Sequence, residues 1–248
     1  MAFDIIGEQV TTFEQSLSGV MKKLEKNLID LVGSSATAQQ LFDANVLLNS
    51  EATMITALQD AGYFSLAEEH ISAFAKIPAA VKASYAAEGF PLVEFTALQK
   101  ADMAALAQMN LEQFNNIGIS AMNELRLGLV QNAVSALPLS SMVDAVAAAT
   151  VGVAANGSPL SNYAATHART AINTFNGEVN IKAAESFGHD KPTDRWRVRG
   201  PNDAKTRDVC SKALTEPIRT RQEWEDAGYF GGSPGGWNCR HRFRPIND

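Results

Sequence analysis

The strongest constraint in the sequence is the return of apolar residues at steps of three and four. In residues 10–32 this spacing places a set of apolar side chains on one face: Phe13, Leu17, Val20, Leu24, Leu28 and Leu31. The same spacing returns within residues 98–136, at Phe114, Ile117, Ala121, Leu125 and Leu129. An α-helix completes a turn every 3.6 residues, so both segments are predicted to be amphipathic helices that bury one face.

Glycine and proline divide the rest of the first three quarters of the chain into further helical segments. Helices are predicted at 37–49, 51–61, 65–87, 140–155 and 160–176. Pro78 should break the third of these, Ser140 or Ser141 should cap the fourth, and Gly177 should end the fifth. Residues 1–178 are therefore expected to form one helical domain.

The character of the sequence changes near residue 180, where Pro, Gly, Trp and Arg become frequent. Residues 195–199 alternate between arginine and apolar side chains, and residues 241–245 alternate similarly, which predicts two strands. A short helix is expected over 220–227. The predicted fold is mainly α, with a long multi-helix region followed by a small α+β Cys/His-containing unit at 179–248, called here the C-terminal module.

Composition and charge narrow the classes of protein that this chain can represent. Hydrophobic residues make up 46% of the chain and charged residues 19%, which excludes wholesale disorder. No apolar run approaches the roughly 20 residues of a membrane span, and the first residues do not resemble a signal peptide, so no membrane association is expected. Residues 1–180 hold 8 Lys and Arg against 17 Asp and Glu, whereas 181–248 hold 13 against 10. This uneven charge indicates two functions or two surfaces.

Cys210, Cys239 and His241 are the strongest candidates for a binding site. Thiolate and imidazole groups are preferred ligands of zinc, and the C-R-H spacing of the last two places both on one side of an extended segment. Small modules with thin cores gain stability from a metal ion. Zinc is the cofactor that this group predicts.

Other interpretations of the same residues stay open. The two cysteines, the only ones in the chain, can also be buried thiols or form a Cys210–Cys239 disulfide, and His241 can simply bind a carbonyl. A fourth metal ligand is not evident. The nearest options for it are Asp203, Asp208 and His189.

A cluster of arginines is the second candidate site. Its members are Arg195, Arg197, Arg199, Arg207, Arg240, Arg242 and Arg244. If the two predicted strands pair, these side chains can cover one face and contact DNA phosphates without reading sequence, or contact a protein partner. The alternative is that they pair with acids while nearby aromatic residues form the core of the module. The acids are Asp194, Asp203, Asp208 and Glu223, and the aromatic residues are Trp196, Trp237 and Phe243.

No catalytic motif accompanies these groups. The sequence lacks G-x-S-x-G, H-E-x-x-H and the phosphate-binding G-x-x-x-x-G-K-[ST]. We therefore expect no enzymatic activity. The competing enzymatic hypothesis is a nucleic-acid-processing module in which His241 acts as acid or base and Arg207 and Arg242 stabilise phosphate charge. A third hypothesis is a metal-stabilised module that binds nucleic acid without catalysis.

Three segments carry a family resemblance. Residues 197–210 read R-V-R-G-P-N-D-A-K-T-R-D-V-C, and residues 235–245 read G-G-W-N-C-R-H-R-F-R-P. The sequence A-T-H-A-R-T-A at 165–171 precedes them. Together they resemble the phage head morphogenesis family, the minor head proteins of the phage Mu and phage SPP1 type, over residues 160–248. Some relatives carry a cysteine where Ala213 and His241 stand here.

The resemblance implies a structural role in a tailed-phage virion. A member of this family would be assembled in the host cytoplasm and docked on the portal, the capsid or the head–tail connector. It would be present in multiple copies around a symmetric ring. Contact with packaged double-stranded DNA, without sequence specificity, is a further implication.

Overall fold

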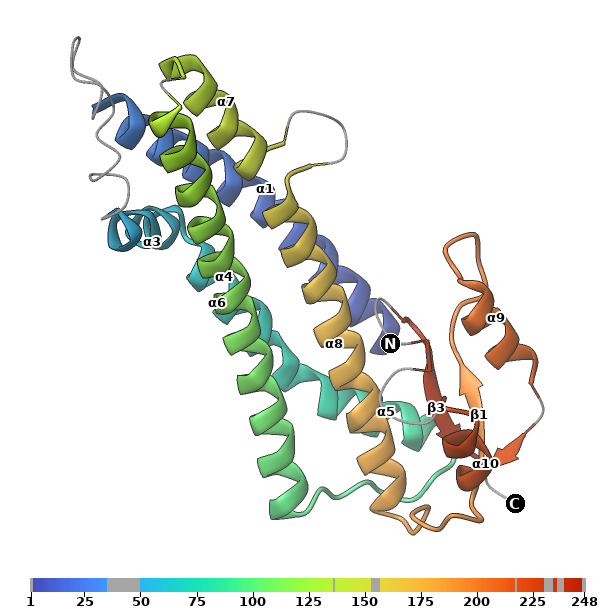
Figure 1. Cartoon of the computed structure of the whole chain (residues 1–248). Helices are drawn as coiled ribbons and strands as arrows, with labels where there is room; N and C mark the ends of the chain where they lie inside the picture. Colours follow the sequence, from blue (N-terminus) through green and yellow to red (C-terminus); the bar gives the residue numbers. More distant parts are fainter. Residues whose placement is uncertain are drawn as a thin grey trace. The chain divides into compact units, whose positions relative to one another are not determined.

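The computed structural model describes residues 2–34, 50–135, 137–152, 157–216, 218–229, 234–235 and 239–246. Its helices are α1 (Ala2–Ser34), α3 (Glu51–Ala61), α4 (Tyr63–Ser72), η1 (Ala73–Lys76), α5 (Ile77–Ala87), α6 (Ala97–Val134), α7 (Leu139–Thr150), α8 (Pro159–Glu185), α9 (Asp208–Thr215) and α10 (Arg221–Asp226). Its strands are β1 (Arg195–Arg199), β2 (Arg219–Thr220) and β3 (Arg242–Pro245). The predicted mainly α fold with a small α+β module is confirmed (Figure 1).

The chain forms two compact units. The first, called here the strand-bearing unit, contains residues 1–10, 71–110 and 168–248. The second, called the helical unit, contains residues 11–70 and 111–167. The predicted division into domains 1–178 and 179–248 stays a prediction. The C-terminal module lies in the same unit as α5 and residues 168–185 of α8.

An aromatic cluster forms the core of the helical unit. The ring of Phe114 lies 5.4 Å from that of Phe13 and 4.4 Å from that of His167. His70 lies 4.8 Å from Phe13, and Tyr63 donates a hydrogen bond from its hydroxyl to the carbonyl of Phe114 at 3.1 Å. Both histidines are buried, which places them in the core of this unit.

The strand-bearing unit is built on an antiparallel sheet in the order β2-β1-β3. The indole of Trp224 in α10 donates a hydrogen bond to the carbonyl of Trp196 at 3.0 Å and lies 5.4 Å from the ring of Phe243. All three side chains are at most 1% exposed. The aromatic core expected of the module is therefore present in Trp196 and Phe243, whereas Trp237 lies outside the described residues.

Several predicted helix boundaries were wrong. The helix expected to end at Gly177 continues to Glu185, because the turns beyond the glycine bury Val179 and Ala183 and this burial outweighs the roughly 1 kcal/mol cost of an interior glycine. Pro138, rather than a serine, precedes α7, which ends at Thr150. The first helix starts at Ala2, well before residue 10. The predicted helix at 37–49 lies outside the described residues.

The break expected near Pro78 takes the form of a 3₁₀ turn, η1, between α4 and α5. Pro78 itself lies in the first turn of α5, where its missing N–H group costs nothing. No helix in the described part of the chain is long and apolar enough to cross a membrane.

Candidate metal centre and arginine face

The three predicted metal ligands meet in one buried group, called here the Cys/His group. Cys210 lies in the first turn of α9, whereas Cys239 and His241 precede β3. The two sulfur atoms are 3.7 Å apart, and the Cys239 sulfur is 3.6 Å from Nδ1 of His241. The three ligand atoms all lie within 4.8 Å of one another, so the group can hold a metal ion.

The orientation of His241 suits a ligand that binds through Nδ1. Its Nε2 lies 2.7 Å from the carbonyl oxygen of Pro201, a distance at which Nε2–H donates a hydrogen bond. That proton position leaves the lone pair of Nδ1 toward the cysteine sulfurs. Gly200 permits this approach, because a Cβ atom there would lie 2.3 Å from Cδ2 of His241.

A second glycine supports the sulfur atoms. The amide of Gly235 donates a hydrogen bond to the sulfur of Cys239 at 3.1 Å, and its carbonyl accepts one from Arg207 at 2.6 Å. A Cβ atom at this position would lie 2.4 Å from the sulfur of Cys210. A side chain at position 235 would therefore overlap the cysteine sulfur atoms, so the Cys/His group needs glycine here.

An ion pair beside this group connects residues 197–210, called here the first motif, to residues 235–245, called the second motif. Arg240 donates two hydrogen bonds to the carboxylate of Asp203, at 2.9 and 2.5 Å. Asp203 also accepts bonds from the amide of Lys205 and the hydroxyl of Thr206. The hydrogen bonds from Arg240 are the main reason that the pKa of Asp203 lies well below its usual range.

Cys210 and Cys239 are buried and form no disulfide with each other in this structure. Burial, and then the neighbouring Cys239, raises the pKa of the Cys210 thiol. A metal that binds here must therefore displace thiol protons, so its affinity depends on pH.

The options considered for a fourth ligand are not part of the group that the described residues form. Asp203 is engaged by Arg240. His189 lies among aromatic side chains, 5.5 Å from the ring of Phe187. Asp208 is exposed at the start of α9. Three protein ligands leave one position of a tetrahedron for water or another group.

The second candidate site is the face of the sheet that lies opposite the tryptophans. In the β1–β3 pair, Arg197 stands opposite Arg244 and Arg199 opposite Arg242. Side chains alternate along a strand, so these four arginines share one face while the intervening apolar residues share the other. The four are called here the arginine face. The expectation that paired strands would gather arginines on one side is confirmed for them.

The other three predicted arginines do not line the cavity described below. Arg195 shares the strand and the side of the arginine face but does not line the cavity described below. Arg207 and Arg240 lie at the Cys/His group, where they bond to Gly235 and Asp203. Of the proposed acidic partners, Asp203 pairs with an arginine of the cluster, while Glu223 caps α10 through Thr220.

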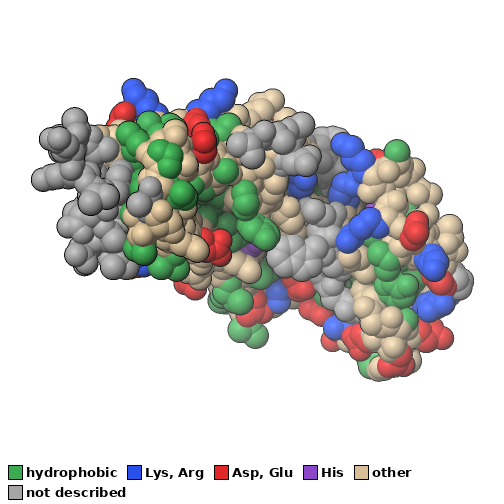
Figure 2. Space-filling view, turned by 45° about the horizontal axis from the view of Figure 1, so that its top comes forward, with side chains coloured by type: hydrophobic (Ala, Val, Ile, Leu, Met, Phe, Trp, Pro, Cys, Tyr) green, Lys and Arg blue, Asp and Glu red, His purple; other side chains and the backbone are tan. Residues whose placement is uncertain are grey.

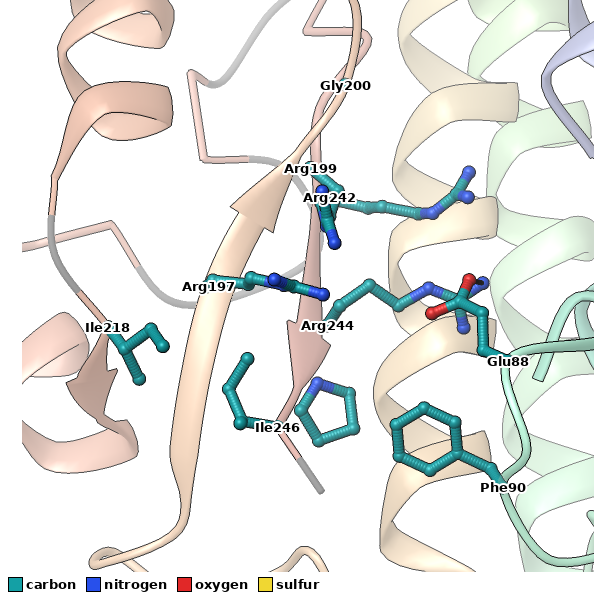
Figure 3. Close-up of a pocket in the computed structure, with 10 residues that line it drawn as sticks. Glu88, Phe90, Arg197, Arg199, Gly200, Ile218, Arg242, Arg244 and Ile246 are labelled. Carbon is teal, nitrogen blue, oxygen red and sulfur yellow. Dashed lines mark hydrogen bonds and ion pairs between the residues drawn. The ribbon is translucent and has the colours of Figure 1, made fainter. Parts of the chain in front are cut away.

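A cavity of about 650 Å³ lies over the arginine face. Besides the four arginines it is lined by Glu88, Phe90, Gly200, Ile218, Pro245 and Ile246. Figure 3 shows the arginines gathered along the two strands, with Glu88 facing the end of Arg244. Every lining residue belongs to the strand-bearing unit.

Arg244 is the most deeply buried of the four, with a side chain only 2% exposed. Its guanidinium carbon lies 3.8 Å from the centre of the Tyr85 ring, and it donates hydrogen bonds to Ser84 and, at 3.2 Å, to Glu88. Beside it, burial lowers the pKa of Arg242 to about 10, and the charge of Arg244 acts in the same direction. Arg242 nevertheless remains charged at neutral pH.

The α5 residues that complete this site were not predicted. Glu88 lies 156 positions before Arg244, and nothing in its local sequence distinguishes it from other surface acids. Ser84, Tyr85 and Glu88 can be recognised as part of this site only from the structure, in which all three contact Arg244 of β3.

No protein-family model, curated protein or solved structure matches this chain.

Proposed function

We propose that this chain is a minor structural protein of a tailed-phage virion, with a C-terminal module that folds around a zinc ion. The observation that carries the proposal is the meeting of two of the three segments that carry the family resemblance, residues 197–210 and residues 235–245. Gly200, Pro201 and Asp203 of the first motif contact His241 and Arg240 of the second. Residues that lie about 40 positions apart in the sequence are thus in direct contact in the folded C-terminal module.

The distances within the Cys/His group support zinc as the metal. A tetrahedral zinc ion with bonds of about 2.3 Å to sulfur and 2.0 Å to nitrogen keeps its ligand atoms roughly 3.5–3.8 Å apart. Two of the three ligand distances fall in this range: Cys210–Cys239 is 3.7 Å and Cys239–His241 is 3.6 Å, and the third lies within 4.8 Å. When bound, the ion would supply a structural cross-link between α9 and the segment that leads into β3.

The engagement of His241 favours a structural role over acid–base catalysis. Its side chain is buried, its Nε2 meets a backbone carbonyl and its Nδ1 faces Cys239. A general acid or base must reach a substrate proton at hydrogen-bond distance. We therefore propose a non-enzymatic protein.

Exposed apolar side chains offer docking surfaces for other virion proteins. In the helical unit the large exposed hydrophobic residues are Leu127, Val134, Leu137, Leu139 and Tyr163. Figure 2 shows hydrophobic side chains spread over the helical part of the face that it displays. Amphipathic helices with additional apolar positions suit packing into grooves of a ring such as the portal, the capsid vertex or the head–tail connector.

Quantitative mass spectrometry of purified, nuclease-treated phage particles tests the virion role. We expect this chain at no more than a small multiple of the portal copy number, as for a component built in near one vertex and assembled in the host cytoplasm. A host protein of similar abundance in the lysate serves as the carry-over control. Absence from mature particles, or an amount no greater than that control, would contradict the proposal.

A further inference from the structure

We infer that the cavity over the arginine face binds the terminal phosphate of a nucleotide, either free or at the end of a nucleic-acid strand. This inference goes beyond the proposed virion role and does not depend on it. All residues that line the cavity belong to the strand-bearing unit, so the site can be tested on the isolated chain.

The net positive charge of the cavity lining favours a multiply charged anion as its ligand. Four of the described lining residues are arginines, and Glu88 is the one carboxylate among them. The cross-strand pairs Arg197–Arg244 and Arg199–Arg242 set like charges directly opposite each other, which is unfavourable without a counter-charge. A carboxylate offers one negative charge, whereas a terminal phosphate offers nearly two and a diphosphate more.

Two arginines of this face, Arg244 and Arg197, have buried donor atoms without hydrogen-bond acceptors. In the described part of the chain no acceptor meets Nε and Nη1 of Arg244, whose guanidinium packs on the Tyr85 ring, or Nε of Arg197. A buried donor without an acceptor costs free energy, more so when it is charged. Phosphate oxygens accept several such bonds at once, and guanidinium groups match their geometry.

The shape of the site selects a chain end or a free nucleotide over the side of a duplex. The cavity of about 650 Å³ is within the range of small-molecule pockets. Each phosphate of duplex DNA carries one charge, whereas a terminal phosphate carries nearly two, so the four arginines of the lining favour a chain end. Phe90 and Ile246 add an apolar wall against which a sugar or base can pack.

Isothermal titration of the full chain, loaded with zinc, tests the site with defined probes. These are inorganic pyrophosphate, deoxyadenosine triphosphate, a short single strand with a 5′-phosphate and the same strand with a 5′-hydroxyl. We expect the phosphorylated probes to bind and the hydroxyl strand to bind at least about tenfold more weakly than its phosphorylated form. Tight binding of the triphosphate alone indicates a free nucleotide, and tight binding of the phosphorylated strand indicates a strand end.

The matched variants are Arg197→Gln with Arg199→Gln, and Arg195→Gln as the control. The double variant removes two cavity donors and should weaken binding at least about tenfold. The control removes the same kind of charge from the same strand, outside the cavity, and should change affinity less than about twofold. Arg199→Gln alone, at an exposed position, keeps the test valid if the double variant fails to fold.

Three outcomes would overturn the inference. The first is the absence of phosphate binding to the folded chain at millimolar concentration. The second is equal weakening by Arg195→Gln and Arg199→Gln, which would indicate general attraction to a basic surface. The third is binding of a glutamate-rich peptide in place of every phosphate probe. None of these outcomes bears on whether the chain is present in virions.

Discussion

At the scale of single residues, the Cys/His group depends on two glycines that make room for it. Gly200 lies against the ring of His241 and Gly235 against both sulfur atoms. The ligands could be proposed from the sequence because cysteine and histidine carry recognisable chemistry. The role of the glycines could not, since it comes from contacts between motifs about 40 residues apart.

Gly200→Ala should destabilise the strand-bearing unit by about 1–3 kcal/mol, because the new methyl group overlaps His241. Gly7→Ala is the matched control in the same unit, since a Cβ atom there meets nothing within 4 Å. Within a helix, that control should be neutral or gain up to about 1 kcal/mol. Urea unfolding followed by tryptophan fluorescence measures both free energies. Equal changes in the free energy of unfolding for the two variants would mean that the close approach of Gly200 to His241 does not affect stability.

Cys239→Ala should abolish stoichiometric zinc binding, because it removes the ligand that lies between the other two. His189→Asn, a change outside the group, should retain one zinc per chain. Metal analysis after gel filtration gives the stoichiometry. Zinc retained by Cys239→Ala would argue that the cysteines are merely buried thiols.

At the scale of elements, local patterns predicted strands β1 and β3. The alternation in Arg195–Arg199 exposes arginines on one side and buries Trp196 and Val198 on the other, as β1 does. The short helix α9 and strand β2 were missed, because each is held by neighbours in space more than by its own sequence. The end of α8 was misplaced for a related reason: tertiary burial overrode the local signal of Gly177.

The helix α10 begins with a capping box, and its loss should be measurable. The Thr220 hydroxyl accepts a bond from the amide of Glu223, whose carboxylate accepts one from the amide of Thr220. Thr220→Ala should cost about 1 kcal/mol, because α10 carries the buried Trp224. Thr215→Ala, an exposed position in the last turn of α9, should cost less. Thermal unfolding compares them, and equal losses would deny the cap a special role.

At the scale of the whole molecule, all three tryptophans lie in residues 196–237 of the sequence, and the two described ones, Trp196 and Trp224, belong to the strand-bearing unit. Helices make up most of the described residues of both units. Two optical signals therefore report on different parts of the chain. Tryptophan fluorescence follows the unit that contains the Cys/His group, whereas circular dichroism follows the helices of both units.

Chelation of zinc should lower the midpoint of the fluorescence transition and leave much of the circular dichroism transition in place. The metal binds the folded site, so its removal withdraws stabilisation from that unit first. Zinc added back, but not magnesium, should restore the midpoint. A single transition that shifts equally in both signals would indicate that the two units unfold together.

The contact between α5 and β3 also sets a time order on biosynthesis. Ser84 and Glu88 are made 160 and 156 residues before Arg244, their partner. At a synthesis rate of about 5–20 residues per second, α5 waits roughly 8–30 seconds for the strand that it meets. During that interval a nascent chain has no arginine face. A ribosome that stops short of residue 242 releases a product in which α5 is made but its partner strand is missing.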